Sequence, residues 1–312
     1  MLILIHYSCI PLDKEVPPDP RTFDPPDTNL RQLSSSLPYF KDYLQAMDHI
    51  NLTDFLEGDG PFTVFMPNQL AFTRFRINNE ISSAEQIPDD KLKNILLYHI
   101  IPGHWTLLQI PGGYYPTYAI EQTTSNPIDL FIDSNDLFRL NGIVAMDEPD
   151  LETINGVIHS ISEVLTIPTV MTHLSVNREL SMIYDILNSD YLDQELQQQF
   201  HQDIPFTFLA PTNLALEMLL EEHEEWQSYK DIPRETLKNI LAYHLVTGNN
   251  LLLKNILEDR MISTLNGTSF TIEPEFTGWV IRDRFGTTAR VTINDIQAVN
   301  GVIHSVDRVL MP

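Results

Sequence analysis

Hydrophobic residues near the start of the chain follow first a helical and then a strand-like pattern. Apolar side chains at helical spacing predict a helix over 39–56, which Gly58 and Pro61 end. The segment Phe62-Thr63-Val64-Phe65-Met66 then predicts a buried strand, ended by a proline. Asn68 follows, and its side chain is expected to cap a short helix.

The clearest helical pattern begins at Pro88, because proline fits a first helical turn. The two aspartates after it would interact favourably with the positive end of the helix dipole. Its apolar face is one stripe at positions i, i+3, i+4 and i+7, formed by Leu92, Ile95, Leu96 and His99. Pro102-Gly103 is expected to end this helix. The following residues, up to Leu165, predict short strands separated by glycine- and asparagine-containing turns.

The same order of patterns occurs twice. The segment TINGVIHSISEVL at 153–165 recurs 145 residues later, at 298–310, as AVNGVIHSVDRVL, and eight of the thirteen positions are identical. The segment LKNILLYHI at 92–100 likewise recurs at 237–245 as LKNILAYHL. Repeats this dense and this regularly spaced indicate an internal duplication.

The duplication and the length of 312 residues both predict two domains. We place the first domain at 30–166 and the second at 167–312, with a tail rich in proline and acidic residues at 1–29. Only Thr166-Ile167-Pro168 separates the copies, so the domains are not expected to tumble freely.

The recurring Asn-Gly-Val-Ile-His segment is expected to close each domain as a turn and a strand. Its Asn-Gly pair, at 155–156 and 300–301, would supply the two positive-φ residues of a type I′ turn. Strand alternation then places His159 and His304 on the apolar face, which favours structural roles for both.

The net charge of −24, from 43 acidic and 19 basic residues, limits the classes of partner that the chain can bind. Nucleic acid and anionic membrane surfaces would repel such a chain, so neither is expected as a partner. Composition is otherwise that of a globular protein, with 43% hydrophobic residues. No apolar run approaches the roughly 18 residues of a membrane span.

Cys9 is the only cysteine, so no intramolecular disulfide can form. Met1–Ile5 resembles the end of a signal peptide whose start lies upstream, and Ser8-Cys9 resembles a lipoprotein processing site. One hypothesis is therefore a bacterial lipoprotein, lipid-anchored at Cys9, with 10–29 as an extended tether. The alternative is a soluble protein with an unpaired cysteine near a disordered start.

Four motifs, in one order, resemble those of the fasciclin domain family. In the second copy they are FTFLAPTN at 206–213, Tyr243-His244, TLNG at 264–267 and NGVIH at 300–304. The first copy matches the family at Phe62–Pro67, Tyr98-His99 and Asn155–His159. It departs from the family at Met66-Pro67-Asn68-Gln69, where Ala-Pro-Thr-Asp is usual, and 117–120 holds Thr-Tyr-Ala-Ile in place of TLNG. The resemblance covers roughly 30–312.

The resemblance implies an α+β protein of two tandem fasciclin-like domains, each a twisted, mostly antiparallel β-sandwich or wedge with a helical cluster. It also implies a cell-surface, periplasmic or secreted location, and adhesion rather than catalysis. In animal members the Tyr-His region has been assigned to integrin binding. By resemblance, that role falls on Tyr98, His99, Tyr243 and His244.

The helical stripe favours a different role for the two histidines. His99 and His244 lie on its apolar face, where a histidine with satisfied hydrogen bonds stabilises a core. Tyr98 and Tyr243 lie one position further round the helix, so they could reach the surface and contact a partner.

Other candidate sites are weaker. No cofactor or metal is expected, because the chain has no metalloprotease motif and Asp133–Asp136 departs from a calcium loop at the next two residues. No nucleophile elbow or phosphate loop occurs, so we expect no enzyme activity. The acidic run at 221–225 predicts a solvated helix face, while Asn51 and Asn266 begin glycosylation sequons.

Two functions therefore remain in competition. The first is an adhesion or interaction module whose partner is an extracellular protein or polysaccharide. The second is a binding protein for a small apolar molecule or a glycan, which would use a groove between the helices and the sheet.

Overall fold

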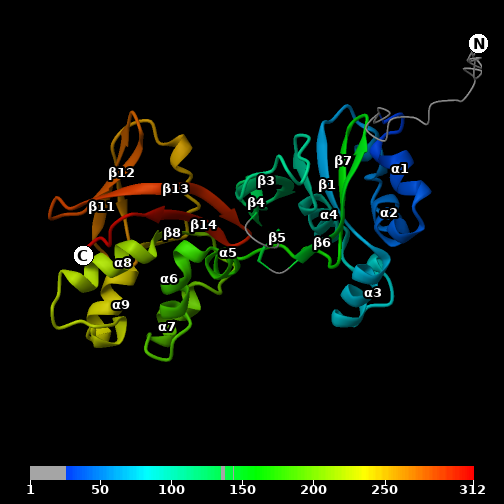
Figure 1. Ribbon diagram of the computed structural model, residues 1–312. Coiled ribbons are helices and arrows are strands. Elements are labelled where there is room, and N and C mark those ends of the chain that lie inside the picture. The colour runs from blue at the N-terminus through cyan, green and yellow to red at the C-terminus, as the bar shows by residue number, and fades with distance from the viewer. Residues whose placement is uncertain (1–25, 135–137, 143) are drawn as a thin grey trace, which may run out of the picture.

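The computed structural model describes residues 26–134, 138–142 and 144–312, which form two α+β domains of the same design. Figure 1 shows them side by side, each with a sheet and a helical cluster. Cys9 and most of the predicted tail lie outside the described residues. The first domain's contacts begin slightly before residue 30, because Thr28 O accepts a hydrogen bond from Ile154 N and Asn29 caps the first helix.

The first domain combines four α-helices with a seven-stranded sheet. Its helices are α1 (Leu30–Ser36), α2 (Lys41–His49), α3 (Gln69–Asn78) and α4 (Asp89–Tyr98). Its strands are β1 (Phe62–Pro67), β2 (Ile100–Pro102), β3 (Gly113–Ile120), β4 (Pro127–Asp133), β5 (Arg139–Leu140), β6 (Val144–Thr153) and β7 (Gly156–Ile161).

The second domain repeats this plan with one extra short helix. Its helices are α5 (Val170–Val176), α6 (Ser181–Leu187), α7 (Gln194–Gln199), α8 (Asn213–Glu221) and α9 (Arg234–Tyr243). Its strands are β8 (Phe206–Pro211), β9 (Leu245–Thr247), β10 (Arg260–Ser263), β11 (Ser269–Glu275), β12 (Gly278–Arg282), β13 (Thr288–Ala298) and β14 (Gly301–Val306).

Both sheets have one strand order. The first runs β2-β1-β7-β6-β5-β4-β3 and the second runs β10-β11-β12-β13-β14-β8-β9, which is the same order read from the other edge. One pair in each sheet is parallel, β1 with β7 and β14 with β8, and the other pairs are antiparallel. Equivalent residues keep their register, because Phe62 pairs with Gly156 and Phe206 with Gly301. The duplication and the α+β class predicted from the sequence are confirmed.

Strand β1 is apolar except for Thr63, because both of its faces are buried. Val64 and Met66 pack into the cluster beneath the helices, whereas Phe65 packs into a second cluster within the curved sheet. In the second domain, Phe208 and Leu209 divide between two clusters in the same way. A strand buried on both faces is a near-continuous hydrophobic run, which is the pattern that predicted it.

Two predicted helices differ from the observed ones. The helix predicted over 39–56 is broken, because α2 ends at His49 and Asn51 has a left-handed φ of 56° before a 3-10 turn at Thr53–Glu57. Helix α4 ends at Tyr98 rather than at Pro102-Gly103, since Ile100–Pro102 pairs with β1 as strand β2. Asn68 does cap α3, accepting a 2.9 Å hydrogen bond from Ala71 N.

The type I′ turn predicted at 155–156 and 300–301 is wrong. None of these four residues has a positive φ. The glycine is needed for close approach instead, since a Cβ on Gly156 would lie 2.1 Å from Phe62 O and one on Gly301 would lie 2.4 Å from Phe206 O. Only a residue without a side chain lets the parallel strands meet there.

Buried polar contacts join the domains. Asp129 of β4 accepts a 2.7 Å hydrogen bond from the backbone N–H of Gln297 in β13. The Tyr114 ring meets the buried His173 ring edge to face, with 5.3 Å between centroids. These contacts join β3 and β4 of the first domain to α5 and β13 of the second.

Candidate functional site

The Tyr-His pairs at the ends of α4 and α9 form two copies of one buried arrangement. His99 Nδ1 donates to Ile95 O at 2.7 Å, and its Nε2 accepts from Leu165 N at 2.9 Å. His244 makes the same contacts with Ile240 O at 2.8 Å and Leu310 N at 3.1 Å. Each histidine thereby joins its helix to the segment that follows the last strand of its domain.

These hydrogen bonds fix the protonation state of both rings. A nitrogen that accepts from a backbone N–H carries no proton, so each ring is neutral with its proton on Nδ1. Burial lowers the pKa of His99 and of His244 to about 4. Both side chains are fully buried, as expected for structural residues.

The expectation that Tyr98 and Tyr243 could reach the surface is wrong, because both side chains are 0% exposed. Tyr98 OH donates to Asp129 O at 3.0 Å and accepts from Asn141 Nδ2 at 2.9 Å. Tyr243 OH donates to Ser269 O at 3.0 Å. Burial raises the pKa of both phenols. Helical spacing alone did not predict this burial, because the sheet covers the face of the helix that carries the tyrosine.

The histidines of the recurring segment are also held by backbone groups, in the opposite tautomer. His159 Nδ1 accepts from Asp150 N at 3.2 Å and its Nε2 donates to Trp105 O at 2.8 Å. His304 repeats this with Asp295 N at 2.9 Å and Leu251 O at 2.8 Å. Burial lowers the pKa of both rings. Both therefore brace the bulged strand β6 or β13 against a loop.

The asparagine of that segment organises the start of each domain. Asn155 Oδ1 accepts from Leu30 N at 2.8 Å, while its Nδ2 donates to Leu56 O and Gly58 O. Asn300 acts equivalently on Val170 N and Phe200 O. The motif thus encodes a structural hub, and its spacing alone does not reveal these distant partners.

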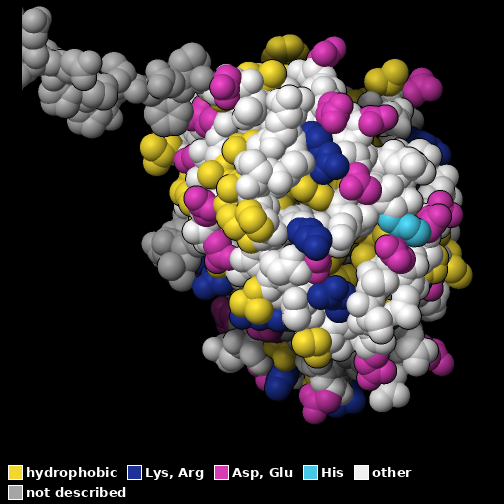
Figure 2. Space-filling model, turned by 90° about the vertical axis from the view of Figure 1, so that its right-hand side faces the viewer, with side chains coloured by type: hydrophobic (Ala, Val, Ile, Leu, Met, Phe, Trp, Pro, Cys, Tyr) yellow, Lys and Arg dark blue, Asp and Glu magenta, His cyan; other side chains and the backbone are white. Residues whose placement is uncertain are grey.

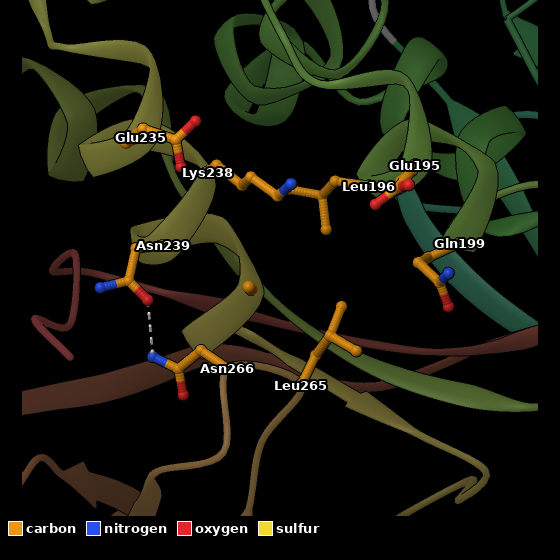
Figure 3. A pocket seen from close by; sticks show the side chains of 9 residues that line it. Glu195, Leu196, Gln199, Glu235, Lys238, Asn239, Leu265 and Asn266 are labelled. Atoms are coloured by element: carbon orange, nitrogen blue, oxygen red, sulfur yellow. Dashed lines mark hydrogen bonds between the residues drawn. The ribbon is translucent and has the colours of Figure 1, made fainter.

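The second domain carries an open groove between its helices and its sheet (Figure 3). It has a volume of about 530 Å³ and lies between α7, α9 and the β10–β11 turn, where its lining comprises Glu195, Leu196, Gln199, Glu235, Lys238, Asn239, Ala242, Leu265 and Asn266. Leu196 and Leu265 point toward one another across it. The TLNG motif at 264–267 and the sequon at Asn266 fall on this groove, whereas no sequence pattern identified its lining residues on α7 and α9.

Polar groups along the groove are already ordered. Asn266 Nδ2 donates to Asn239 Oδ1 at 3.2 Å, and Lys238 Nζ lies 3.1 Å from Asp193 Oδ1. That hydrogen bond with Asp193 raises the pKa of Lys238. Amides, carboxylates and an ammonium beside two leucines can together recognise a hydroxyl-rich molecule with one apolar face.

The described residues contain no group of three or more potential metal ligands. His104 lies 3.8 Å from Glu152 and is not brought beside His99, whose two ring nitrogens are used. The candidate calcium loop falls partly on residues outside the described ranges. No described helix has the length and apolar character needed to cross a bilayer.

The model of the fasciclin domain matches the chain twice, at 38–168 and 178–312. Transforming growth factor-beta-induced protein ig-h3 of Oryctolagus cuniculus is 25% identical over 273 residues, which are 82% of this chain and 35% of that protein. Protein sll1483 of Synechocystis is 31% identical over 129 residues, 41% of this chain and 68% of that protein. The chain thus spans about a third of the length of the first relative.

A solved FAS1 domain pair, from the insect cell adhesion molecule fasciclin I, has a similar arrangement. It superposes with a TM-score of 0.51 over 91% of this chain and 97% of that chain, at 19% identity. The likeness therefore extends over both domains and concerns the fold.

Proposed function

Given that the chain belongs to the fasciclin domain family, we propose that it is a non-catalytic adhesion or interaction protein of the cell surface or extracytoplasmic space. The observation that carries the proposal is the match of both domains, as a pair, to the domain pair of an insect cell adhesion molecule. Its partner would be an extracellular protein or polysaccharide.

The chemistry of the motif residues supports a binding role over a catalytic one. General acid–base catalysis requires a side chain that can reach a substrate proton. The four motif histidines, His99, His159, His244 and His304, are instead buried and hydrogen-bonded through both ring nitrogens.

The family's binding region would act indirectly in this chain. We propose that Tyr98, His99, Tyr243 and His244 shape the surface that a partner touches, because their own side chains are buried. Lipid attachment at Cys9 would place the pair of domains at a membrane. Loss of membrane partitioning in Cys9→Ala would support that anchor, and an aqueous protein with unmodified Met1 would contradict it.

Adhesion can be tested with beads coated with the folded chain. They should adhere to cells or extracellular matrix more strongly than beads coated at equal density with the heat-unfolded chain, which has the same composition and charge. Equal adhesion by both would indicate non-specific attachment and contradict the proposal.

The groove of Figure 3 favours a second candidate function, the binding of a glycan. Its lining of amide and carboxylate groups suits hydroxyls better than an apolar ligand. Glycan-array binding should weaken in Gln199→Ala, whose side chain lines the groove. Gln198→Ala is the matched control, since that exposed residue is its neighbour in α7 and does not line the groove. Equal binding by the two variants would exclude the groove.

A further inference from the structure

Helices α3 and α8 are equivalent parts of the duplication, and each presents hydrophobic side chains to solvent. Leu70 and Leu214, 144 residues apart, occupy the same position and are 56% and 63% exposed. Ile77, at the far end of α3, is 70% exposed. The outward face of α3 therefore carries two exposed hydrophobic side chains, and the equivalent face of α8 carries one, and nothing within the described protein covers them.

The outward faces of α3 and α8 carry opposite charge. Helix α3 contains Arg74 and Arg76 and no acidic residue, although acidic residues outnumber basic ones by 43 to 19 in the chain. Helix α8 contains Glu217 and Glu221 and no basic residue. The duplicated helix has thus diverged into a basic and an acidic form.

The charged side chains on these two faces are free to pair with a partner. Arg76 is paired with Asp42 at 3.2 Å, whereas the exposed Arg74 donates a hydrogen bond of 3.5 Å to the Ser162 carbonyl and, among the described residues, forms no ion pair. Just beyond α8, Arg308 pairs with the C-cap residue Glu222 at 2.9 Å. Within the described part of the chain, Glu217 and Glu221 take part in no ion pair.

A hollow beside α8 adds shape to the acidic face. Its volume is about 510 Å³, and its lining includes Glu217, Leu220, Glu221, Glu224 and Trp226. Trp226 stacks on His223 with 3.9 Å between ring centroids, which holds the indole in place. A guanidinium bound among these carboxylates could also lie over the indole, where cation–π attraction contributes.

The two helices lie at opposite ends of the molecule. In Figure 1, α8 is at the end that carries the C-terminus, and α3 is at the end that carries α1 and α2. Figure 2 views that second end and shows Lys and Arg side chains among hydrophobic ones. A copy that used its α3 face would therefore leave its own α8 face free.

We propose that α3 of one copy docks on the α8 face of a second copy, with Arg74 between Glu217 and Glu221 and with Leu70 and Ile77 against the apolar residues of that face. Because the two surfaces differ, the contact is heterologous and extends into head-to-tail rows. The proposal deepens the adhesion function, on which it rests for its biological role, by naming a second copy of this chain as a partner.

A contact made by single helices buries little surface, and the net charge of −24 repels copies at long range. Each contact is therefore weak, and many copies on one surface would bind through avidity. At about 0.15 M salt, charges further apart than about 8 Å are largely screened, whereas a close Arg–Glu pair still attracts. Association should be measured under these conditions.

Sedimentation velocity on the full chain, at concentrations up to about 100 μM, tests a contact of this strength. The wild-type chain should form dimers and longer species as its concentration rises. Arg74→Glu alone, and Glu217→Lys with Glu221→Lys, should each weaken association by about tenfold or more. Arg284→Glu, and Glu258→Lys with Asp259→Lys, are the charge-matched controls at exposed positions elsewhere, and both should associate like the wild type.

Mixing the two blocked variants provides the decisive measurement. Arg74→Glu keeps the acidic face and the double lysine variant keeps the basic face, and the two reversed faces are themselves of opposite charge. The mixture should therefore recover the association that each variant alone has lost. A wild-type chain that stays monomeric, a mixture that does not dimerise, or controls that weaken association equally would each overturn the proposal. Wild-type beads that bind matrix while the chain stays monomeric would refute self-association and leave the adhesion function standing.

Discussion

The Asp129 carboxylate accepts a 2.7 Å hydrogen bond from the backbone N–H of Gln297, 168 residues further along the chain and in the other domain. Asp129 is 8% exposed. Gln297 also contacts the buried His173, because its carbonyl oxygen lies 3.3 Å from His173 Nε2. The joint between the domains thus depends on a buried acidic group.

Burial raises the pKa of Asp129 to about 7, while nearby Lys254 opposes and Asp295 reinforces that rise. The folded pKa is above the unfolded value of about 3.9, so stability from this group is greatest in acid and is lost as pH rises from about 4 to about 7. Asp129→Asn keeps an acceptor for Gln297 without the charge. It should be at least as stable as the wild type at pH 8 in urea unfolding.

Asp129→Leu is the matched variant that removes the acceptor. It leaves the Gln297 N–H unsatisfied and should cost about 1–3 kcal/mol of unfolding free energy. If the asparagine and leucine variants are equally stable, the interdomain hydrogen bond contributes nothing.

His99→Ala and His244→Ala should each lower the melting temperature. Each change leaves a buried backbone N–H, that of Leu165 or Leu310, without its acceptor, at about 1–3 kcal/mol, and also opens a cavity. His49→Ala, at a partly exposed position on α2, is the control and should have little effect. Unchanged stability of His99→Ala together with lost adhesion would instead identify a partner-contacting residue.

The neutral histidines should make the protein sensitive to acid. His99, His173 and His244 have folded pKa values of about 4, below the unfolded value of about 6.5. The stability from keeping these rings neutral is present above pH 6.5 and is lost as pH falls toward 4, at about 3 kcal/mol per ring.

Urea unfolding between pH 8 and pH 4 should be compared in the Asp129→Asn background, because the opposite titration of Asp129 would mask part of the loss. A free energy that does not fall over that range would contradict the neutral assignment of the rings.

Gly156→Ala should destabilise the first domain far more than an ordinary glycine substitution. Its Cβ would lie 2.1 Å from Phe62 O, so the parallel pair β1–β7 must separate. Gly248→Ala is the control, because no atom lies within 4 Å of its Cβ and only the positive φ costs about 1 kcal/mol. Thermal unfolding of the two variants measures the difference, and similar melting temperatures would show that the strands can adjust.

The sequence by itself determined the duplication, the α+β class and the elements with a strong local signal. Strand β1, the Asn68 cap and helix α4 were all predicted because their causes lie within a few residues of chain: a nearly continuous apolar run, a capping side chain and a helical stripe.

Only the tertiary structure decided what the motif residues do. Tyr98 is buried because the sheet curls over α4, Asn155 binds Leu30 from 125 residues away, and Gly156 is required by the neighbouring strand rather than by a turn. The Asp129–Gln297 contact likewise exists only between distant segments, and the exposure of Leu70 on α3 and Leu214 on α8 follows from how each helix packs. Periodicity records which face of an element is buried, whereas the group that meets that face is set by packing across the whole chain.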